Sequence, residues 1–480
     1  MTVRTELFIG NGWHRATGGE TFPVVNPATE EVLAEVQHAG VADVDAAVTA
    51  ARGCFDGADW QALAARKRGA MLYRAGEILA RRLDEMAALE TRQNGKPLFE
   101  SKIDVGMTVE TLKYYAGWTD KFGGNILSVD NGDFVFTDRV PLGVIGAIVP
   151  WNFPLNLASW KFAPALAAGC TVVLKPASET PLTALLMGEI MQEAGFPAGA
   201  FNVIPGGGRT TGTALVQHPG VDKITFTGST EVGKQVMRDA AETVKRVTLE
   251  LGGKSPNVIF ADADLKAAAR GALNGIFYGK GEVCAAGSRL LIHQSVHDQV
   301  VDELVARSKK LVPGDPFDKG TRLGAVVSRK QQETVLSYIA AGKQDGAKLV
   351  AGGNAAQVNG KGYYVEATVF DEAKPGMRIV DEEIFGPVLA VVTFEDDDQG
   401  VRLANQTIYG LAAGIWTKDI TKALKVARAI RAGTVWVNTY NLYDPAAPFG
   451  GFKQSGYGRD LGREALDGYT ESKTVWVGLR

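Results

Sequence analysis

One cysteine lies in a run of small residues that leaves room for a substrate to approach. Cys284 stands between Gly281 and Gly287, inside the segment Gly279–Arg289. A cysteine built into a packed core would more usually have bulky apolar neighbours. The segment is therefore typical of a nucleophilic thiol, although a small buried hydrophobic residue is the commoner role of a single cysteine.

Two polar residues could assist such a thiol. Glu250 lies in the apolar run Val247–Leu251, where a carboxylate is disfavoured and is rarely tolerated without a partner or a purpose. Asn152, within Pro150–Pro154, follows a predicted strand and places an amide where ligands of parallel sheets bind. A turn residue before a helix is the structural alternative for Asn152.

A glycine loop follows the predicted strand that ends near Phe226. Gly228, Gly233 and Lys234 have nearly the spacing of a P-loop, but Gln235 stands where a Ser or Thr hydroxyl would bind Mg²⁺. The dinucleotide fingerprint GxGxxG is absent as well. The loop indicates a phosphate at a helix N-terminus, where free backbone N–H groups lie, or a structural turn between strand and helix.

Composition excludes several classes of protein. The chain has 480 residues, of which 45% are apolar and 22% charged, and its net charge is −3. These values predict a soluble protein of two or three domains with no bias toward nucleic acid or anionic membrane. The cysteines Cys54, Cys170 and Cys284 lie far apart, which argues against a zinc site or disulfides. No signal peptide or membrane-spanning run is visible, so we expect a cytoplasmic protein without a metal.

Alternating strands and helices set the expected fold. Short apolar strands alternate with helices over residues 144–251, and a second such series begins near Leu265 after Gly252-Gly253. This pattern predicts an α/β protein with parallel sheets covered on both faces. Asn131-Gly132 between two β-rich runs predicts a hairpin over residues 124–141. The tail strand at residues 473–477 has no local partner, so we expect it to pair with this hairpin in another subunit.

Seven motifs occur in an order that resembles the aldehyde dehydrogenase superfamily, whose NAD(P)⁺-dependent enzymes oxidise aldehydes to acids. They are Pro150–Pro154, Lys175–Ala177, Phe226–Gly233, Leu249–Lys254, Gly281–Arg289, Glu382–Pro387 and Pro448–Gly456. The resemblance implies two doubly wound, Rossmann-like domains with a small β extension. The implied ranges are 1–122 and 142–252 for the NAD(P)-binding domain, 253–465 for the catalytic domain, and 123–141 with 466–480 for an oligomerisation extension. A homodimer or homotetramer is expected.

The resemblance also implies a mechanism. Cys284 attacks the aldehyde, while the Asn152 amide and the Cys284 backbone N–H hold the developing oxyanion. After hydride transfer, Glu250 activates the water that hydrolyses the thioester. A helix start or a nearby cation is expected to lower the thiol pKa. Lys161 and Glu464 match positions assigned to structural support or proton transfer near that base.

Further residues are implied for the cofactor and the substrate. The cofactor residues are Trp151, Lys175, Ser178, Gly228, Ser229, Gly233, Leu251, Glu383 and Phe385. The substrate-pocket residues are Met107, Phe153, Trp160, Val283, Ala285, Tyr443 and Phe449. The pocket set holds no Arg or Lys, which weakens succinate semialdehyde as a substrate and favours an aromatic or medium aliphatic aldehyde.

Two positions depart from the family pattern. Many NAD-preferring members carry Glu where this chain has Ser178, and a carboxylate there would repel the 2′-phosphate of NADP⁺. We therefore expect use of NADP⁺ alongside NAD⁺. Glu282 stands where Gln is commoner, and its carboxylate is expected to face away from the thiol. The alternatives are a CoA-acylating semialdehyde dehydrogenase, a catalytically silent structural or binding homologue, and a P-loop phosphotransferase, which Gln235 disfavours.

Overall fold

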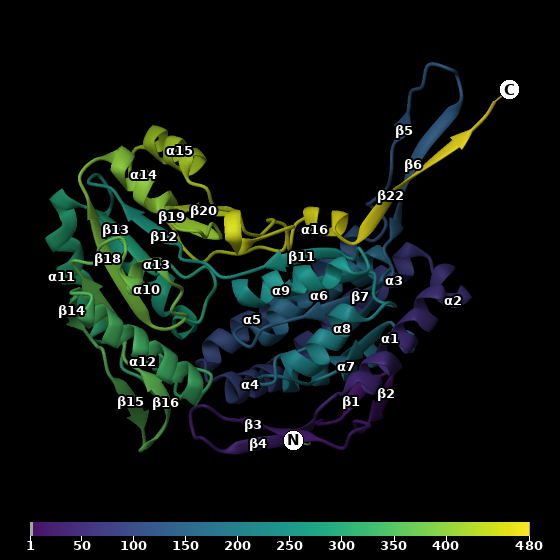
Figure 1. Cartoon of the computed structure of the whole chain (residues 1–480), viewed down its shortest axis with the longest axis horizontal. Coiled ribbons are helices and arrows are strands. Elements are labelled where there is room, and N and C mark those ends of the chain that lie inside the picture. Colours follow the sequence, from purple (N-terminus) through teal and green to yellow (C-terminus); the bar gives the residue numbers. More distant parts are fainter. Residues whose placement is uncertain (1–2, 480) are drawn as a thin grey trace.

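Two sheets form two lobes, and a β arm projects from one of them (Figure 1). The computed structural model of the chain describes residues 3–479. Both sheets are mainly parallel and carry helices on both faces, so the expected α/β class is confirmed. None of the helices in this range combines the length and apolar character needed to cross a membrane.

The first sheet has the strand order β2-β1-β9-β8-β7-β10-β11-β21. Its five central strands are parallel, whereas β1, β2 and β21 run antiparallel to their neighbours. The strands are β1 Leu7–Ile9, β2 Gly12–His14, β7 Val144–Ile148, β8 Thr171–Lys175, β9 Phe201–Val203, β10 Lys223–Thr227, β11 Arg246–Glu250 and β21 Gly456–Tyr457. β21 lies within the range 253–465 expected to be catalytic, yet it extends this first sheet.

Helices cover both faces of the first sheet. One face packs against α6 Pro154–Ala168 and α7 Leu182–Glu193, with α3 Ala65–Arg81, α4 Leu83–Asn94 and α5 Leu98–Trp118 outside them. The other face packs against α1 Val41–Asp56, α8 Thr213–Gln217 and α9 Thr230–Ala241. Short α2 Ala58–Gln61 and the π-helical turn η1 Gly208–Gly212 complete this lobe.

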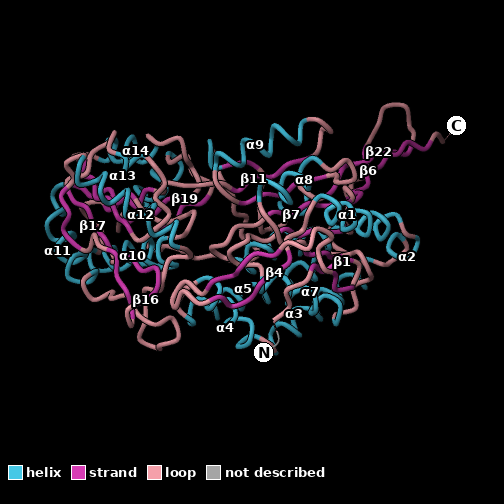
Figure 2. Tube along the Cα trace, turned by 60° about the horizontal axis from the view of Figure 1, so that its bottom comes forward, coloured by secondary structure: helices cyan, strands magenta, loops and turns pink. Residues whose placement is uncertain are grey.

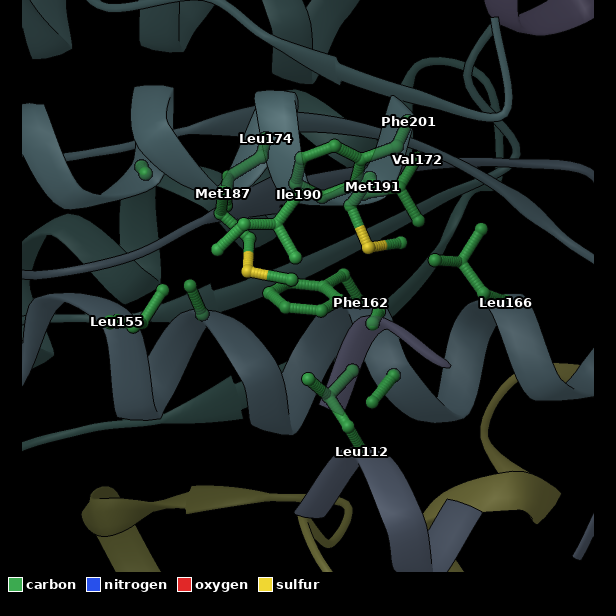
Figure 3. Packing of buried hydrophobic residues seen from close by; sticks show 14 of the residues in the cluster. Leu112, Leu155, Phe162, Leu166, Val172, Leu174, Met187, Ile190, Met191 and Phe201 are labelled. Carbon is green, nitrogen blue, oxygen red and sulfur yellow. The ribbon is translucent and has the colours of Figure 1, made fainter. Parts of the chain in front are cut away.

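Helix α6 carries two of the predicted site residues, Trp160 and Lys161. All but one of its residues are buried, and Figure 3 shows Phe162 pointing toward Met187 and Met191 of α7. The Phe162 and Phe201 rings lie 5.1 Å apart, edge to face. Dense packing of this kind holds the helix rigidly. Lys161 and Trp160, which lie on the same helix, are therefore fixed relative to the first sheet.

The second sheet has the order β14-β17-β18-β13-β12-β19-β20, parallel except for β14. Its strands are β12 Pro256–Ile259, β13 Arg289–His293, β14 Lys348–Ala351, β17 Thr368–Asp371, β18 Val388–Phe394, β19 Ala412–Trp416 and β20 Thr434–Val437. One face packs on α10 Leu265–Phe277 and α11 His297–Ser308. The other packs on α12 Arg329–Gln344, α13 Arg378–Asp381, α14 Asp397–Asn405 and α15 Ile420–Ala429.

The remaining elements are short. Two small hairpins are formed by β3 Thr21–Val25 with β4 Val32–Gln37, and by β15 Ala355–Val358 with β16 Lys361–Val365. Single turns of helix are η2 Tyr278–Gly281, η3 Gln294–Val296, η4 Lys453–Ser455 and α16 Glu464–Asp467. Of these, η2 matters most, because it leads directly into the cysteine segment.

The projecting arm corrects one expectation. It consists of β5 Ile126–Leu127, β6 Phe134–Pro141 and β22 Thr470–Val477, and both views show it extending away from the lobes (Figures 1 and 2). The predicted hairpin is confirmed. However, β22 pairs with β6 of its own chain, from Thr470 opposite Pro141 to Val477 opposite Phe134. Pairing in another subunit was wrong, because β5 occupies only one edge of β6 and the tail reaches the other.

Candidate active site

Cys284 lies where two cavities meet. It follows η2 and precedes β13, and it is partly exposed. One cavity has a volume of about 350 Å³ and the other about 230 Å³, and Cys284 is the residue that lines both. A thiol in this position can contact one ligand on each side.

The larger cavity is mainly apolar and holds an aromatic cluster. The Trp160 ring lies 5.5 Å from that of Phe449 and 6.1 Å from that of Tyr443. Six of the seven predicted pocket residues line it, namely Met107, Phe153, Trp160, Val283, Tyr443 and Phe449. Ala285 does not, because it is fully buried and its carbonyl accepts a hydrogen bond from Tyr440 Oη at 2.9 Å.

Sequence reasoning missed several polar residues of this cavity. They are Asp104, Asn156, Asn274, Tyr278 and Asn441. Asp104 is already paired, since its Oδ2 accepts a hydrogen bond from Lys96 Nζ at 2.6 Å and both side chains are buried. The cavity therefore presents no unpaired Asp104 charge to a substrate. Helical spacing from Met107 could have identified Asp104, which lies three residues earlier on α5.

The smaller cavity lies beside the N-terminus of α9. Six of the predicted cofactor residues line it, namely Trp151, Gly228, Ser229, Leu251, Glu383 and Phe385. Ser229 caps α9, its Oγ accepting a hydrogen bond from Val232 N at 3.3 Å. A helix N-terminus favours phosphate, and the Trp151 and Phe385 rings, 5.2 Å apart, border the same space. These residues fit a dinucleotide.

Three predicted cofactor residues lie outside the lining of that cavity. A Cβ on Gly233 would come within 2.5 Å of Leu251 Cδ2, so this glycine allows α9 to approach β11. Lys175 is buried at the end of β8, where burial lowers its pKa to about 8. Ser178 Oγ donates a hydrogen bond to Gly206 O at 3.1 Å. Gln331, which sequence reasoning missed, lines the cavity and donates to Phe385 O at 2.7 Å.

Asn152 is oriented by the cysteine segment itself. It follows β7, is 5% exposed, and donates from Nδ2 to Glu282 O at 3.0 Å. An amide nitrogen carries two N–H groups, so one stays available for a substrate oxygen. Both Asn152 and Cys284 line the smaller cavity.

Glu250 is a buried carboxylate at the end of β11. Within residues 3–479, neither of its oxygens has a hydrogen-bond partner. Burial raises its pKa well above the usual value, and the negative charge of Asp460 raises it further. A carboxylate with a raised pKa is a stronger base, and its free oxygens could accept hydrogen bonds from water.

The thiol pKa contradicts expectation. Burial raises the pKa of Cys284 to about 12, and the carboxylates of Glu383 and Glu250 add to the effect. The expected lowering by a helix start or a cation is wrong, because the charged groups that act most on this thiol are anions. A reaction at this sulfur would therefore need a base to take its proton.

The acidic partner of Lys161 is Asp460. Both are buried, at 1% and 2% exposed, and Lys161 Nζ donates to Asp460 Oδ2. Glu464, expected at this place, is instead exposed at the start of α16. The backbones of Asp460 and Phe449 form two hydrogen bonds, one in each direction. These bonds place Asp460 beside the motif Pro448–Gly456. Asp460, four residues before Glu464, is thus the acid whose charge acts on Glu250.

Glu282 faces away from the thiol. Its Oε2 lies 2.8 Å from Lys280 Nζ, and its Oε1 accepts a hydrogen bond from Val327 N at 3.0 Å. The carboxylates that raise the pKa of Cys284 most are those of Glu383 and Glu250, not that of Glu282.

Comparison with known proteins decides the family. Residues 13–475 match the model of the aldehyde dehydrogenase family. The chain belongs to the aldehyde dehydrogenase family. The protein DhaS of Bacillus subtilis is 49% identical to it over 99% of this chain and 96% of that protein.

Solved structures agree. The NAD⁺ complex of a Bacillus cereus aldehyde dehydrogenase is 48% identical and superposes with a TM-score of 0.98, over 99% of this chain and 97% of that one. The indole-3-acetaldehyde dehydrogenase AldA of P. syringae, solved with NAD⁺ and IAA, is 46% identical with a TM-score of 0.98, over 100% and 97%. The expected fold and enzyme class, an aldehyde dehydrogenase, are confirmed, and these complexes support the expected use of NAD(P)⁺.

Proposed function

We propose that this dehydrogenase oxidises an aldehyde through a covalent bond to Cys284 and releases the free acid. The observation that carries the proposal is the position of Cys284 at the junction of the two cavities. The aldehyde would occupy the larger cavity, and the nicotinamide end of the cofactor the smaller one. Both would then reach the same sulfur.

The first half of the reaction forms the carbon–sulfur bond. Cys284 Sγ attacks the carbonyl carbon while the thiol proton passes to Glu250. The oxygen of the resulting thiohemiacetal is held by the free N–H of Asn152 and the backbone N–H of Cys284. One such donor contributes about 3 kcal/mol, or about 100- to 1,000-fold in rate. NAD(P)⁺, when bound, supplies the acceptor for the hydride, which leaves a thioester on Cys284.

The second half breaks that bond with water. Glu250, whose oxygens are free to accept, first releases the thiol proton to solvent and then takes a proton from the water that attacks the thioester carbon. The carbon–sulfur bond then breaks, the acid leaves, and the sulfur regains a proton. Lys161 and Asp460 lie close enough to act on the charge of Glu250, so we assign them to tuning or relaying that proton.

The cavity chemistry supports an aromatic or medium aliphatic aldehyde. Trp160, Tyr443 and Phe449 offer ring edges and faces, and aromatic groups pack well against such surfaces. The P. syringae relative named above is an indole-3-acetaldehyde dehydrogenase, which agrees with this class. A panel of aldehydes of graded size and aromaticity tests it.

We further propose that the chain associates with itself through the β arm. Its exposed apolar side chains include Ile126 at 76%, Phe134 at 41% and Trp476 at 57%. A dimer, or a dimer of dimers, would cover them. We assign the enzyme to the cytoplasm because its three cysteines are free, as in a reducing compartment.

One assay separates the proposal from its rivals. Reduced cofactor should appear at 340 nm with NAD(P)⁺ and a small aldehyde, without CoA. A CoA-acylating enzyme would need CoA, and a silent homologue would give no signal. Loss of the signal in Cys284→Ser is expected, and persistence of turnover in that variant would refute the nucleophile assignment.

A further inference from the structure

A buried lysine and asparagine join the two backbone segments that carry the catalytic groups. Lys280 is 1% exposed and lies four residues before Cys284. Its Nζ donates to Asn94 Oδ1 at 2.7 Å and to Asn94 O at 2.9 Å. Asn94, fully buried at the end of α4, donates from Nδ2 to Trp151 O at 2.8 Å. One chain of contacts therefore links the cysteine segment to the segment that holds Asn152.

The same lysine also holds Glu282. The Lys280–Glu282 ion pair is buried, and the backbone carbonyl of Glu282 is the acceptor that orients the Asn152 amide. The contacts form a closed loop, from Lys280 through Asn94 to the Asn152 segment and back through Glu282. A shift of any member moves the Asn152 amide relative to the sulfur.

The backbone here is one that needs such anchoring. Gly279, Lys280 and Gly281 adopt consecutive positive φ angles of 59°, 62° and 73°. Lys280 is the only one of the three with a Cβ, and this conformation is unfavourable for it. A Cβ on Gly281 would come within 2.1 Å of Gly386 O, so the segment is also tightly enclosed. Strained residues persist only where the surroundings over-determine them.

We propose that Lys280 and Asn94 are positioning residues that set the oxyanion-binding geometry of Asn152 against Cys284. The inference rests on the proposed roles of Cys284 and Asn152. Neither Lys280 nor Asn94 lines either cavity, so they act through the two segments and not on the substrate.

The deciding experiment is a double-mutant cycle between Lys280→Met and Asn152→Ala. The readout is the pre-steady-state burst of reduced cofactor, with KM for the aldehyde measured in parallel. Each single variant should lower the burst rate by about 100-fold, because a small misplacement or a lost donor costs that much. KM should change by less than about threefold. When Asn152 is already alanine, adding Lys280→Met should lower the burst rate by less than about threefold further. The reason is that both substitutions act through the Asn152 amide.

Two further variants guard against a purely structural effect. Lys280→Gln combined with Glu282→Gln keeps a neutral hydrogen-bonding pair and should recover the burst to within about fivefold of wild type. Arg52→Met is the matched control, since Arg52 pairs with Asp222 and donates to Gly220 O at 3.0 Å at the amino-terminal edge of the first sheet. It should lower the melting temperature and leave the burst unchanged.

The outcomes are distinct. Additive losses in the cycle, or a burst in Lys280→Met equal to that of Arg52→Met, would overturn the positioning role. If Lys280→Met does not fold, the cycle of Asn94→Ala with Asn152→Ala decides by the same criterion. If Asn152→Ala alone leaves the burst rate unchanged, the proposed oxyanion role of Asn152 is refuted. If Asn152→Ala lowers the burst rate but the two substitutions are additive, only the positioning role of Lys280 and Asn94 is refuted.

Discussion

Replacing Glu250 by glutamine should slow both halves of the reaction in ways that can be told apart. Glutamine has the size of glutamate and cannot take a proton. Thioester hydrolysis then loses its general base, a contribution of about 100- to 10,000-fold. Steady-state turnover should fall by that factor, while one equivalent of reduced cofactor per active site still forms.

The pH dependence of that single burst follows from the thiol. Burial raises the pKa of Cys284 far above pH 8, so only a small fraction of the thiol is ionised at that pH. Without Glu250 to take the proton, attack depends on this fraction. The burst rate of Glu250→Gln should therefore rise about tenfold per pH unit from pH 7 to 10. In the wild type it should rise as Glu250 ionises and then level off, because only the ionised carboxylate accepts the thiol proton.

The same substitution has a predicted effect on stability. Burial raises the folded-state pKa of Glu250 above 4.5, so the folded protein holds a proton that the unfolded chain releases. Wild-type stability therefore falls as pH rises from about 4.5 through the raised pKa, by at most about 1.4 kcal/mol per pH unit. Glutamine does not ionise. The melting temperature of Glu250→Gln should be close to that of wild type at or below the unfolded-state pKa. It should exceed that of wild type increasingly as pH rises from there to the raised folded-state pKa, above which the difference stays constant.

Stopped-flow absorbance at 340 nm, mass spectrometry of the acyl-enzyme and calorimetry across pH measure these three effects. Cys284→Ser is the control that forms no thioester. A burst in Glu250→Gln that does not change with pH, or a turnover equal to wild type, would refute the assignment of Glu250 as the base.

Four other predictions follow from single contacts. Wild type should use NADP⁺ with a kcat/KM within about 1,000-fold of that for NAD⁺. Ser178→Glu should shift the ratio of the two kcat/KM values toward NAD⁺ by at least about tenfold. An unchanged ratio would show that residue 178 does not select between the two cofactors. Phe449→Ala should lower kcat/KM for aromatic aldehydes more than for acetaldehyde, and equal losses would mean that the ring is only packing. Glu282→Gln should leave the acidic limb of the pH–rate profile in place, because its carboxylate faces Lys280; a shifted limb would contradict that orientation. Trp476→Glu should lower the molecular mass in solution that light scattering measures. An unchanged mass would show that the chain does not associate through the arm.

The sequence was sufficient for the fold class because most elements carry their own local pattern. The alternation over residues 144–251 was predicted from short apolar runs, and β7, β8, β9, β10 and β11 lie within it. The strand β12 lies before Leu265, where the second series was expected to begin, because four residues beside glycines have no distinctive period. The pairing of β22 was missed for a different reason. A strand at the end of the chain gives no local sign of which edge it will reach.

At the site, the sequence predicted the residues that lie within motifs. It did not predict the properties that depend on which charged groups lie nearby in space. Cys284, Asn152 and most residues of the smaller cavity lie within motifs. The thiol pKa depends on which charges surround it in space, and no spacing along the chain shows that Glu383 and Glu250 both act on it. The choice of Asp460 over Glu464 has the same origin. Two acids four residues apart look equivalent in sequence, but one is buried against Lys161 and the other is exposed.

The raised thiol pKa and the buried ion pair bear on one question, which is how a neutral thiol is made to react at the right moment. A thiol that stays protonated is protected from oxidation and alkylation until a base and an oxyanion donor act together. Glu250 and Asn152 come from the first sheet, whereas Cys284 precedes a strand of the second. Their geometry therefore depends on how the two lobes meet. Lys280, on the cysteine segment, donates a hydrogen bond to Asn94 on the first lobe. This contact joins the two lobes beside Cys284 and Asn152, where their relative position matters for the reaction.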